Sequence, residues 1–397
     1  MMTMTLIDRR EGTGRHLTRR SASRGARSSF SGPRRTKEEA VRVIALMFTS
    51  LLALVSLAIL GCAASRGTVA DDDATADDDD NDDNNDDNDD DFAWSQMGGD
   101  CPALVSVWGT SHDDVFAVGW NWPANAAAVL HFDGASWSHM TSGEGKFTLW
   151  SVSGTSPSDV FAVGEGGEET VILRYDGDSW SVMPAPLDLG FALRGVWAGS
   201  VSNVYAVGFD AKNDGVVGHF DGATWSLVTG GFPSHLQCAW GTSPSDVYVS
   251  GNGTSHFDGA TWSPAPGVIA NAGISSFWEL SPSDIFAVGG VTSACVVFYY
   301  DGSTWSVMYE EPSAVCAFGV WGASPDDVFA VGGYEDQENA DHDTILHYDG
   351  LSWSIMDNGT YPFMLFSAWG SGPSDVFAVG SDYSYQAGVI LHYGPLQ

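Results

Sequence analysis

The sequence predicts an all-β fold, a seven-bladed β-propeller of four-stranded antiparallel blades, closed by an N-terminal strand that completes the last blade. Three observations lead to this prediction. A unit of about 44 residues recurs seven times, each unit contains four short strand patterns, and the repeat region begins and ends with complementary fragments of one unit. Repeats of this length with four strands each are typical of propellers.

The repeat is easiest to follow at the residue that precedes the second strand of each unit. This residue is an aspartate in six units and an asparagine in one, and successive copies are 38 to 48 residues apart. The seven copies are Asp114, Asp159, Asn203, Asp246, Asp284, Asp327 and Asp375.

Each unit alternates strand patterns with turn signals. The first strand ends in Val-Trp-Gly, as at Val107–Gly109, and a Ser-Pro-Ser-Asp turn follows. The second strand, Val-Phe-Ala-Val-Gly, is apolar on both faces, which indicates that neighbouring sheets cover it on both sides. The third strand runs into Asp-Gly, a pair that favours a tight two-residue hairpin, and the fourth strand carries Trp-Ser.

The two ends of the repeat region complement each other. The last unit stops after its third strand, within Val389–Gln397. The stretch Phe92–Met97, Phe-Ala-Trp-Ser-Gln-Met, repeats the fourth-strand pattern without the three strands that precede it elsewhere. We therefore expect this stretch to complete the last blade, which removes an exposed sheet edge. The propeller domain then spans residues 92–397.

Two units carry a glycine pair after the second strand, then a tyrosine and a tryptophan in the next two strands. These residues are Gly289-Gly290, Tyr300 and Trp305, and Gly332-Gly333, Tyr348 and Trp353. In this pattern, the region 92–397 resembles kelch-type propellers. The chain also looks similar to uncharacterised propeller lipoproteins of Gram-negative bacteria. The other five units keep one glycine of the pair. The resemblance implies the fold, and a fold alone does not imply a function.

The first 61 residues have the pattern of a secretory signal peptide with a long basic n-region. Residues 1–42 hold 11 of the 16 Lys+Arg, and the apolar run Val43–Leu60 follows. The alternative for this run is a membrane anchor, since its length approaches that of a spanning helix. The sequence Ile-Leu-Gly-Cys resembles the lipobox of bacterial lipoproteins. This resemblance implies lipidation of Cys62 and an outer-membrane lipoprotein of the cell envelope, either periplasmic or surface-exposed.

Residues 62–91 are predicted to form a disordered Asp/Asn-rich spacer, because Asp71–Asp91 contains 14 acidic residues and almost no apolar ones. A diffuse calcium-binding segment is the alternative. Residues 92–397 carry 33 acidic and 4 basic residues, a net charge of −29. Such a surface repels nucleic acid and anionic membrane surfaces, so we expect no nucleic-acid partner and a membrane contact through the lipid alone. We expect the protein to be a monomer.

Residues that recur at one register in most units are predicted to be architecture. Thirteen of the 16 tryptophans end the first strand or lie on the fourth, and we assign them to packing between blades. They are Trp94, Trp108, Trp137, Trp180, Trp197, Trp225, Trp240, Trp262, Trp278, Trp305, Trp321, Trp353 and Trp369. A third-strand register holds His131, His219, His256, His347 and His392. Because a ring spreads these histidines over separate blades, the register favours a structural role over a zinc site.

Binding residues are expected on the loops that vary between units, because binding residues concentrate on loops held by a rigid scaffold. The connections from second to third strand and from fourth to first strand differ in length and chemistry, and alternation of strand direction puts them on one face. Trp120, Trp122, Tyr383 and Tyr385 lie in such loops of the first and last units, and we predict that they contact a ligand. The alternative is that these rings cover the blade ends.

Two further features are predicted for the same face. The loop of the sixth unit offers oxygen ligands for calcium, with a solvated acidic loop as the alternative. These candidate ligands are Glu335, Asp336, Glu338, Asp341 and Asp343. Cys295 and Cys316 are expected to form a disulfide, whereas Cys101 and Cys238 belong to distant blades and are not expected to pair. No cofactor other than calcium is expected.

The sequence offers no nucleophile elbow, zinc motif or glycine-rich phosphate loop, so no catalytic residue is predicted. The favoured function is a membrane-anchored binding protein that presents one face of the propeller to a carbohydrate, peptide or protein in the cell envelope. A propeller hydrolase or lyase that acts on glycans is an alternative, because acids on different blades can meet in a way that sequence spacing does not show. A structural part of an envelope assembly is a further alternative.

Overall fold

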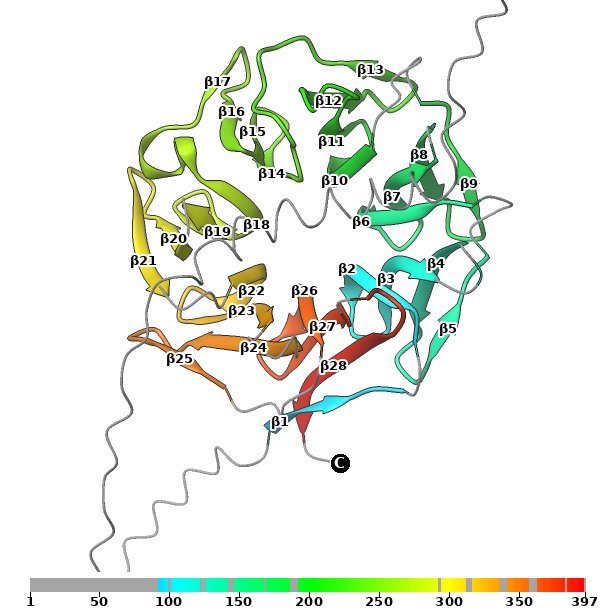
Figure 1. The fold of residues 1–397 in the computed structure, drawn as a ribbon, viewed down its shortest axis with the longest axis vertical. Helices are drawn as coiled ribbons and strands as arrows, with labels where there is room; N and C mark the ends of the chain where they lie inside the picture. Colours follow the sequence, from blue (N-terminus) through cyan, green and yellow to red (C-terminus); the bar gives the residue numbers. More distant parts are fainter. Residues whose placement is uncertain are drawn as a thin grey trace, which may run out of the picture. The chain divides into compact units, whose positions relative to one another are not determined.

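The computed structural model describes residues 92–397 apart from 99–100, 122–123, 125, 142–145, 168, 186–191, 292–293, 312–315, 336–340, 357–362, 383 and 396–397. Seven antiparallel sheets of four strands each surround a central axis (Figure 1). The predicted seven-bladed β-propeller is therefore confirmed. Among the described residues, no helix has the length and apolar character needed to cross a membrane.

Each of the first three blades follows chain order from the innermost strand outward. Blade 1 consists of β2 (Ala103–Ser111), β3 (Asp114–Asn121), β4 (Ala126–Phe132) and β5 (Trp137–His139). Blade 2 consists of β6 (Thr148–Ser156), β7 (Asp159–Gly166), β8 (Glu169–Tyr175) and β9 (Trp180–Val182). Blade 3 consists of β10 (Ala192–Ser200), β11 (Asn203–Phe209), β12 (Gly215–Phe220) and β13 (Trp225–Leu227).

The next three blades repeat this order. Blade 4 consists of β14 (Cys238–Ser243), β15 (Asp246–Gly251), β16 (Gly253–Phe257) and β17 (Trp262–Pro264), and the 3-10 helix η2 (Gly267–Asn271) follows it. Blade 5 consists of β18 (Gly273–Ser281), β19 (Asp284–Val291), β20 (Ala294–Tyr300) and β21 (Trp305–Glu311). Blade 6 consists of β22 (Cys316–Ser324), β23 (Asp327–Glu335), β24 (Asp341–Tyr348) and β25 (Trp353–Ile355).

Blade 7 is assembled from both ends of the described chain. Its inner strands are β26 (Met364–Gly372), β27 (Asp375–Ser381) and β28 (Gly388–Pro395), and its outer strand is β1 (Phe92–Gln96). The register of β1 against β28 runs from Phe92 opposite Pro395 to Gln96 opposite Leu391. The prediction that the N-terminal strand closes the ring is confirmed.

The fourth-strand tryptophans join neighbouring blades through a repeated aromatic contact. Each indole meets, edge to face, an aromatic ring on the second strand of the preceding blade, with centroids 5.9–6.4 Å apart and planes at 71–82°. The seven pairs are Trp94–Phe329, Trp137–Phe377, Trp180–Phe116, Trp225–Phe161, Trp262–Tyr205, Trp305–Tyr248 and Trp353–Phe286. The predicted role of this tryptophan register in packing between blades is confirmed.

The first-strand tryptophans pack in the opposite sense, against the innermost strand of the following blade. In blade 2, a Cβ on Gly154 would lie 2.5 Å from the ring of Trp108 in blade 1, so the glycine leaves room for the indole. Serines on the innermost strands add hydrogen bonds between blades, such as Val152 N–H to Ser106 Oγ at 3.2 Å. Ser153, which replaces the tryptophan in blade 2, accepts the Ala198 N–H of blade 3 at 3.1 Å.

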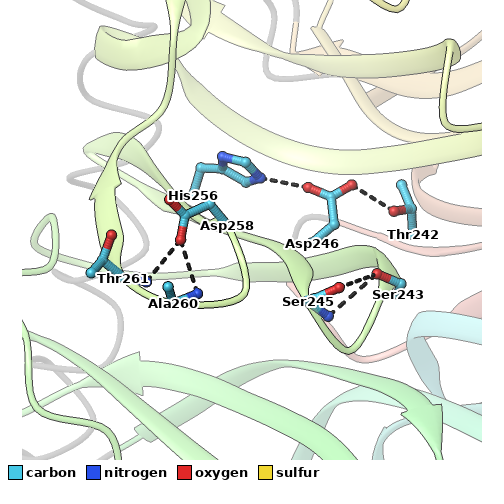
Figure 2. A network of polar contacts seen from close by, with 8 residues as sticks. All are labelled: Thr242, Ser243, Ser245, Asp246, His256, Asp258, Ala260 and Thr261. Carbon is cyan, nitrogen blue, oxygen red and sulfur yellow. Dashed lines mark hydrogen bonds and ion pairs between the residues drawn. The ribbon is translucent and has the colours of Figure 1, made fainter.

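The aspartate or asparagine that opens each second strand binds the third strand of its own blade. Figure 2 shows this contact in blade 4, where one oxygen of Asp246 meets His256 Nε2 and the other accepts the Thr242 hydroxyl. The seven contacts are His131–Asp114, Arg174–Asp159, His219–Asn203, His256–Asp246, Tyr299–Asp284, His347–Asp327 and His392–Asp375. The histidine register is therefore part of the blade architecture, as predicted.

The turn between third and fourth strands differs from the predicted two-residue hairpin. In blade 1, Phe132 pairs with Trp137, so the turn has four residues. The Asp133 carboxylate accepts the N–H groups of Ala135 and Ser136 at 3.0 and 2.9 Å, and Gly134 supplies a φ of +87°. The turn is still tight, since the Asp133 N–H donates to the Ser136 carbonyl at 3.4 Å. Its two central residues are Gly134 and Ala135 in place of the predicted Asp-Gly pair, because the Asp133 side chain binds the backbone of the turn.

The variable connections share one face, as predicted. Three backbone hydrogen bonds join a loop between second and third strands to a connection between fourth and first strands: Gly388 N–H to Cys101 O, Asn252 N–H to Ser234 O, and His235 N–H to Asn213 O. We call this side of the ring the variable face.

The edge-to-face contacts predict a large loss of stability on truncation. Trp225→Ala removes the indole between Phe161 and Phe220 and should lower the free energy of unfolding by about 3–5 kcal/mol, measured by denaturant titration. Leu227→Ala, on the same strand with a side chain 47% exposed, is the control and should change it by less than about 0.5 kcal/mol. Equal effects of the two substitutions would contradict the assignment.

Candidate functional site

A β-bulge near the variable face interrupts the innermost strand of most blades. The register of the first strand against the second shifts by one residue there in six of the seven blades, which leaves one residue outside the regular pairing. Gln237, which directly precedes β14, holds the same place in blade 4. The seven residues, which we call the bulge ring, are Val105, Trp150, Arg194, Gln237, Ser275, Phe318 and Phe366.

The bulge ring varies between two positions that are nearly constant. The preceding residue is apolar in every blade: Leu104, Leu149, Leu193, Leu236, Ile274, Ala317 and Leu365. The following residue is small in every blade: Ser106, Ser151, Gly195, Cys238, Ser276, Gly319 and Ser367. At the bulge, only phenylalanine occurs more than once. Packing therefore does not constrain the bulge position, which lies on the innermost strands next to the variable loops. Its side chain can differ from blade to blade to suit a ligand.

Trp150 and Arg194 form the first cluster of the bulge ring, on neighbouring blades. The guanidinium carbon of Arg194 lies 4.0 Å from the centroid of the Trp150 ring. One carboxylate oxygen of Glu165 accepts both Arg194 Nη2 at 3.1 Å and Trp150 Nε1 at 3.2 Å. The indole and the guanidinium are therefore held in fixed positions by a shared acceptor.

Phe318 and Phe366 form the second cluster, with Tyr385 from the variable loop of blade 7. Phe318 and Phe366 have ring centroids 5.7 Å apart, and Tyr385 stacks on Phe366 at 6.0 Å with planes 15° apart. Tyr385 has a φ of +54°, and its N–H donates to the carbonyl of Asp382 at 3.0 Å. The loop thus directs the phenol ring onto the bulge ring.

An electrostatic interaction links the two clusters, because Tyr385 of the second affects the pKa of Arg194 in the first. Burial lowers the pKa of Arg194, and the Glu165 carboxylate and the Tyr385 phenol oppose this effect. Since an arginine keeps its charge in proteins, the site presents a fixed cation beside aromatic rings. Such an arrangement can hold apolar or aromatic groups by stacking.

The predicted ligand-binding residues are partly placed by the structure. Trp120 lies near the end of β3, opposite Ala103 and Ala127, and its side chain is half-buried. Tyr385 belongs to the aromatic cluster on Phe366. Trp122 and Tyr383 lie outside the described residues.

The remaining predicted sites are not tested by the described residues. Cys62, Asp336 and Glu338 lie outside them, as do the side chains of Glu335, Asp341 and Asp343. For the predicted disulfide, the backbone of Cys295 lies opposite Gly290 and Glu311, and that of Cys316 opposite Gly333. The side chains of these two cysteines also lie outside the described part of the chain.

The bulge ring was not predicted from the sequence. One signal was present, because Trp150 is one of three tryptophans outside both repeated registers, with Trp120 and Trp122. A second signal was Arg194, one of the 4 basic residues of the propeller and not part of a repeated register. Both residues stand two positions before the Val-Trp-Gly pattern of the first strand.

Glu279 is a departure from the repeat on an innermost strand, where five other blades have glycine. Burial, together with the nearby charge of Asp246, raises the pKa of Glu279 to about 7. A carboxyl group with a raised pKa next to an ionised one is the pattern of a glycosidase acid pair. Here, however, both oxygens of Asp246 are held by His256 and Thr242, so the second carboxylate is engaged in the scaffold.

No protein-family model matches the chain, and no curated protein matches it. Among solved structures, a YCF48 bound to D1 peptide is 17% identical, with a TM-score of 0.56, and the match covers 77% of this chain and 97% of that one. A catalytically inactive virginiamycin B lyase from Staphylococcus aureus with quinupristin is 9% identical, with a TM-score of 0.57 and coverages of 76% and 99%. The GH74 xyloglucanase from Xanthomonas campestris is 11% identical, with a TM-score of 0.54 and coverages of 74% and 52%.

These structures share the propeller fold with the chain at low sequence identity. They include a peptide complex, a lyase and a glycoside hydrolase. The same fold thus occurs in proteins that bind ligands and in enzymes, so the function has to be argued from the residues of this chain.

The raised pKa of Glu279 predicts a pH-dependent effect of Glu279→Gln. The folded-state pKa of about 7 exceeds the ordinary value of 4.5, so the wild type loses stability relative to the glutamine variant as pH rises from 4.5 through 7. After discounting for solvent screening, the stability of the glutamine variant relative to the wild type should be about 1 kcal/mol greater at pH 8 than at pH 5. It is measured as the difference in melting temperature between variant and wild type at both pH values, and a constant difference would contradict the assignment.

Proposed function

We propose that the propeller is a binding module and that the bulge ring, with the loops around it, contacts the ligand. The observation that carries this proposal is the variation of one register, from valine to tryptophan to arginine, on a frame whose neighbouring positions hardly vary. A scaffold selected only for stability would repeat a residue at this position as it does at the flanking ones. Binding surfaces on repeat proteins are built in this way, with a constant frame and individual contact residues.

The ligand that fits these residues best is a peptide or an extended segment of a protein. Trp150 and the Phe318–Phe366–Tyr385 cluster offer apolar and aromatic surface, the type of residue that dominates binding energy at protein interfaces. The net charge of −29 in residues 92–397 favours a ligand with basic side chains. The structural similarity to a YCF48 bound to D1 peptide agrees with this class of ligand.

A carbohydrate is the second candidate. The parallel planes of Phe366 and Tyr385, 15° apart, form the kind of flat aromatic surface on which a sugar ring stacks. This candidate predicts a neutral ligand whose binding changes little with salt, whereas a basic peptide binds more weakly as salt rises.

The proposal also includes the place of the protein in the cell. It is supported by the signal-peptide pattern of residues 1–61, by the lipobox around Cys62 and by the acidic spacer of residues 62–91. At ~3.3 Å per residue, a fully extended spacer holds the propeller up to roughly 100 Å from a membrane. The protein would then be a kelch-like envelope lipoprotein that presents its variable face to a ligand.

The proposal is tested by selecting ligands with the purified protein from a peptide display library and from a glycan array. A selected peptide should bind at least about tenfold more weakly to Trp150→Ala and to Phe366→Ala than to the wild type, measured by titration calorimetry. Leu351→Ala changes an apolar side chain that is 90% exposed, in the turn between third and fourth strands on the opposite face, and should leave the affinity unchanged.

Melting temperatures separate binding from folding, since both substituted rings are partly exposed and each variant should melt within a few degrees of the wild type. Selected peptides that bind both alanine variants with wild-type affinity would overturn the proposed site. Selection of glycans alone, with loss of binding in the same variants, would replace the peptide by a carbohydrate at that site.

A further inference from the structure

The turn between the first and second strands of blade 1 departs from the repeat. Its sequence is Ser-His-Asp-Asp, and His112 takes the place that a proline occupies in five of the other blades. These prolines are Pro157, Pro244, Pro282, Pro325 and Pro373. A histidine in this turn occurs once, at the blade that follows the closure of the ring.

His112 reaches out of its own blade into blade 7. Its Nδ1 atom lies 2.7 Å from Asp375 Oδ1, although the two residues are 263 positions apart in the chain. The same oxygen lies 2.7 Å from His392 Nε2 in the contact that every blade makes. Two imidazoles from different strands therefore converge on one carboxylate, and the three possible ligand atoms all lie within 4.8 Å of one another.

We propose that His112, Asp375 and His392 bind a divalent transition-metal ion, such as zinc, at the closure of the ring. Two imidazole nitrogens and one carboxylate oxygen form a ligand set typical of zinc with three protein ligands, and a water completes the tetrahedron. The nitrogen ligands distinguish this site from calcium and magnesium sites, which use oxygen ligands.

The surroundings suit a metal ligand set. Asp375 and His392 are 16% and 15% exposed and already held in place, whereas the His112 side chain is 51% exposed and can turn to admit an ion. The ion would replace the hydrogen bonds that both imidazoles make to the same carboxylate oxygen.

The position of the site gives it a role. His112 belongs to blade 1, and the other two ligands belong to blade 7, whose outer strand comes from the opposite end of the repeat region. Coordination would cross-link blades 1 and 7, whereas the other six blade-to-blade junctions have no histidine in this turn. The ion would stabilise the folded ring by binding the folded state alone.

The test compares the full-length protein with His112→Pro, which restores the residue of the other blades. Because a chain with a net charge of −35 collects cations diffusely, the readout is the difference between variants.

Wild type should bind one more equivalent of zinc than His112→Pro in calorimetry, and cobalt should give visible absorption bands in the wild type alone. At a hundredfold excess over Kd, zinc should raise the melting temperature of the wild type by about 5 °C more than that of the variant. Calcium and magnesium should not distinguish the two proteins.

A second variant asks whether the geometry is sufficient. By the repeat, position 157 stands to Asp114 and His131 of blade 1 as position 112 stands to Asp375 and His392 of blade 7. Pro157→His should therefore add a second equivalent of tightly bound zinc. Equal zinc and cobalt binding by wild type and His112→Pro would overturn the proposal. A Pro157→His variant with no added equivalent would overturn the geometric argument behind it.

Discussion

The edge-to-face contact between a fourth-strand tryptophan and a second-strand aromatic of the preceding blade is the interaction on which the ring depends. It is made seven times with nearly the same geometry, and each contact completes the core of one blade with a ring from its neighbour. The core clusters accordingly cross blade boundaries, as where Phe116 of blade 1 packs with Trp180 of blade 2. A blade without its neighbour would expose these rings, so the series of contacts has to continue around the whole ring.

Closure constrains the chain at both ends. The seventh tryptophan is Trp94, which lies on β1, packs against Phe329 of blade 6 and is 6% exposed. Five residues near the start of the described chain thus supply both the edge of blade 7 and the last aromatic contact. The ring that results has a constant frame, with histidine–aspartate contacts within blades and serine contacts between them. Positions outside this frame can change without loss of packing, and the bulge ring and His112 are two such positions.

The sequence predicted the frame well, because each of its parts occurs up to seven times. The role of Phe92–Met97 followed from its match to the other fourth strands, and the histidine register followed from its recurrence. The central residues of the turn between third and fourth strands were missed because Asp-Gly shows the need for a positive φ but does not show that the aspartate carboxylate binds the N–H groups beyond the glycine. The bulge ring was missed because one extra residue breaks the alternation of a strand, so Trp150 and Arg194 fall outside any simple pattern.

Side-chain contacts between residues of neighbouring blades that lie far apart in the sequence could not be predicted either. Glu165 meets Arg194 across 29 positions and His112 meets Asp375 across 263, and nothing in a single sequence pairs such residues. The repeat nevertheless identifies where to look, since Glu165, Arg194 and His112 each depart from the residue types found at their positions in the other units. Departure from a structural repeat is thus a physical criterion for function that needs only one chain and its fold.

The most direct test of this account is amide hydrogen exchange after deletion of residues 92–96, compared with deletion of five residues from Asp71–Asp91. The account predicts that loss of β1 removes protection from β28 and β27 of blade 7 and from β23 of blade 6, which contains Phe329, whereas the control deletion changes none of them. Unchanged protection in these strands would show that the propeller holds together without its N-terminal strand. It would contradict the dependence of the fold on closure.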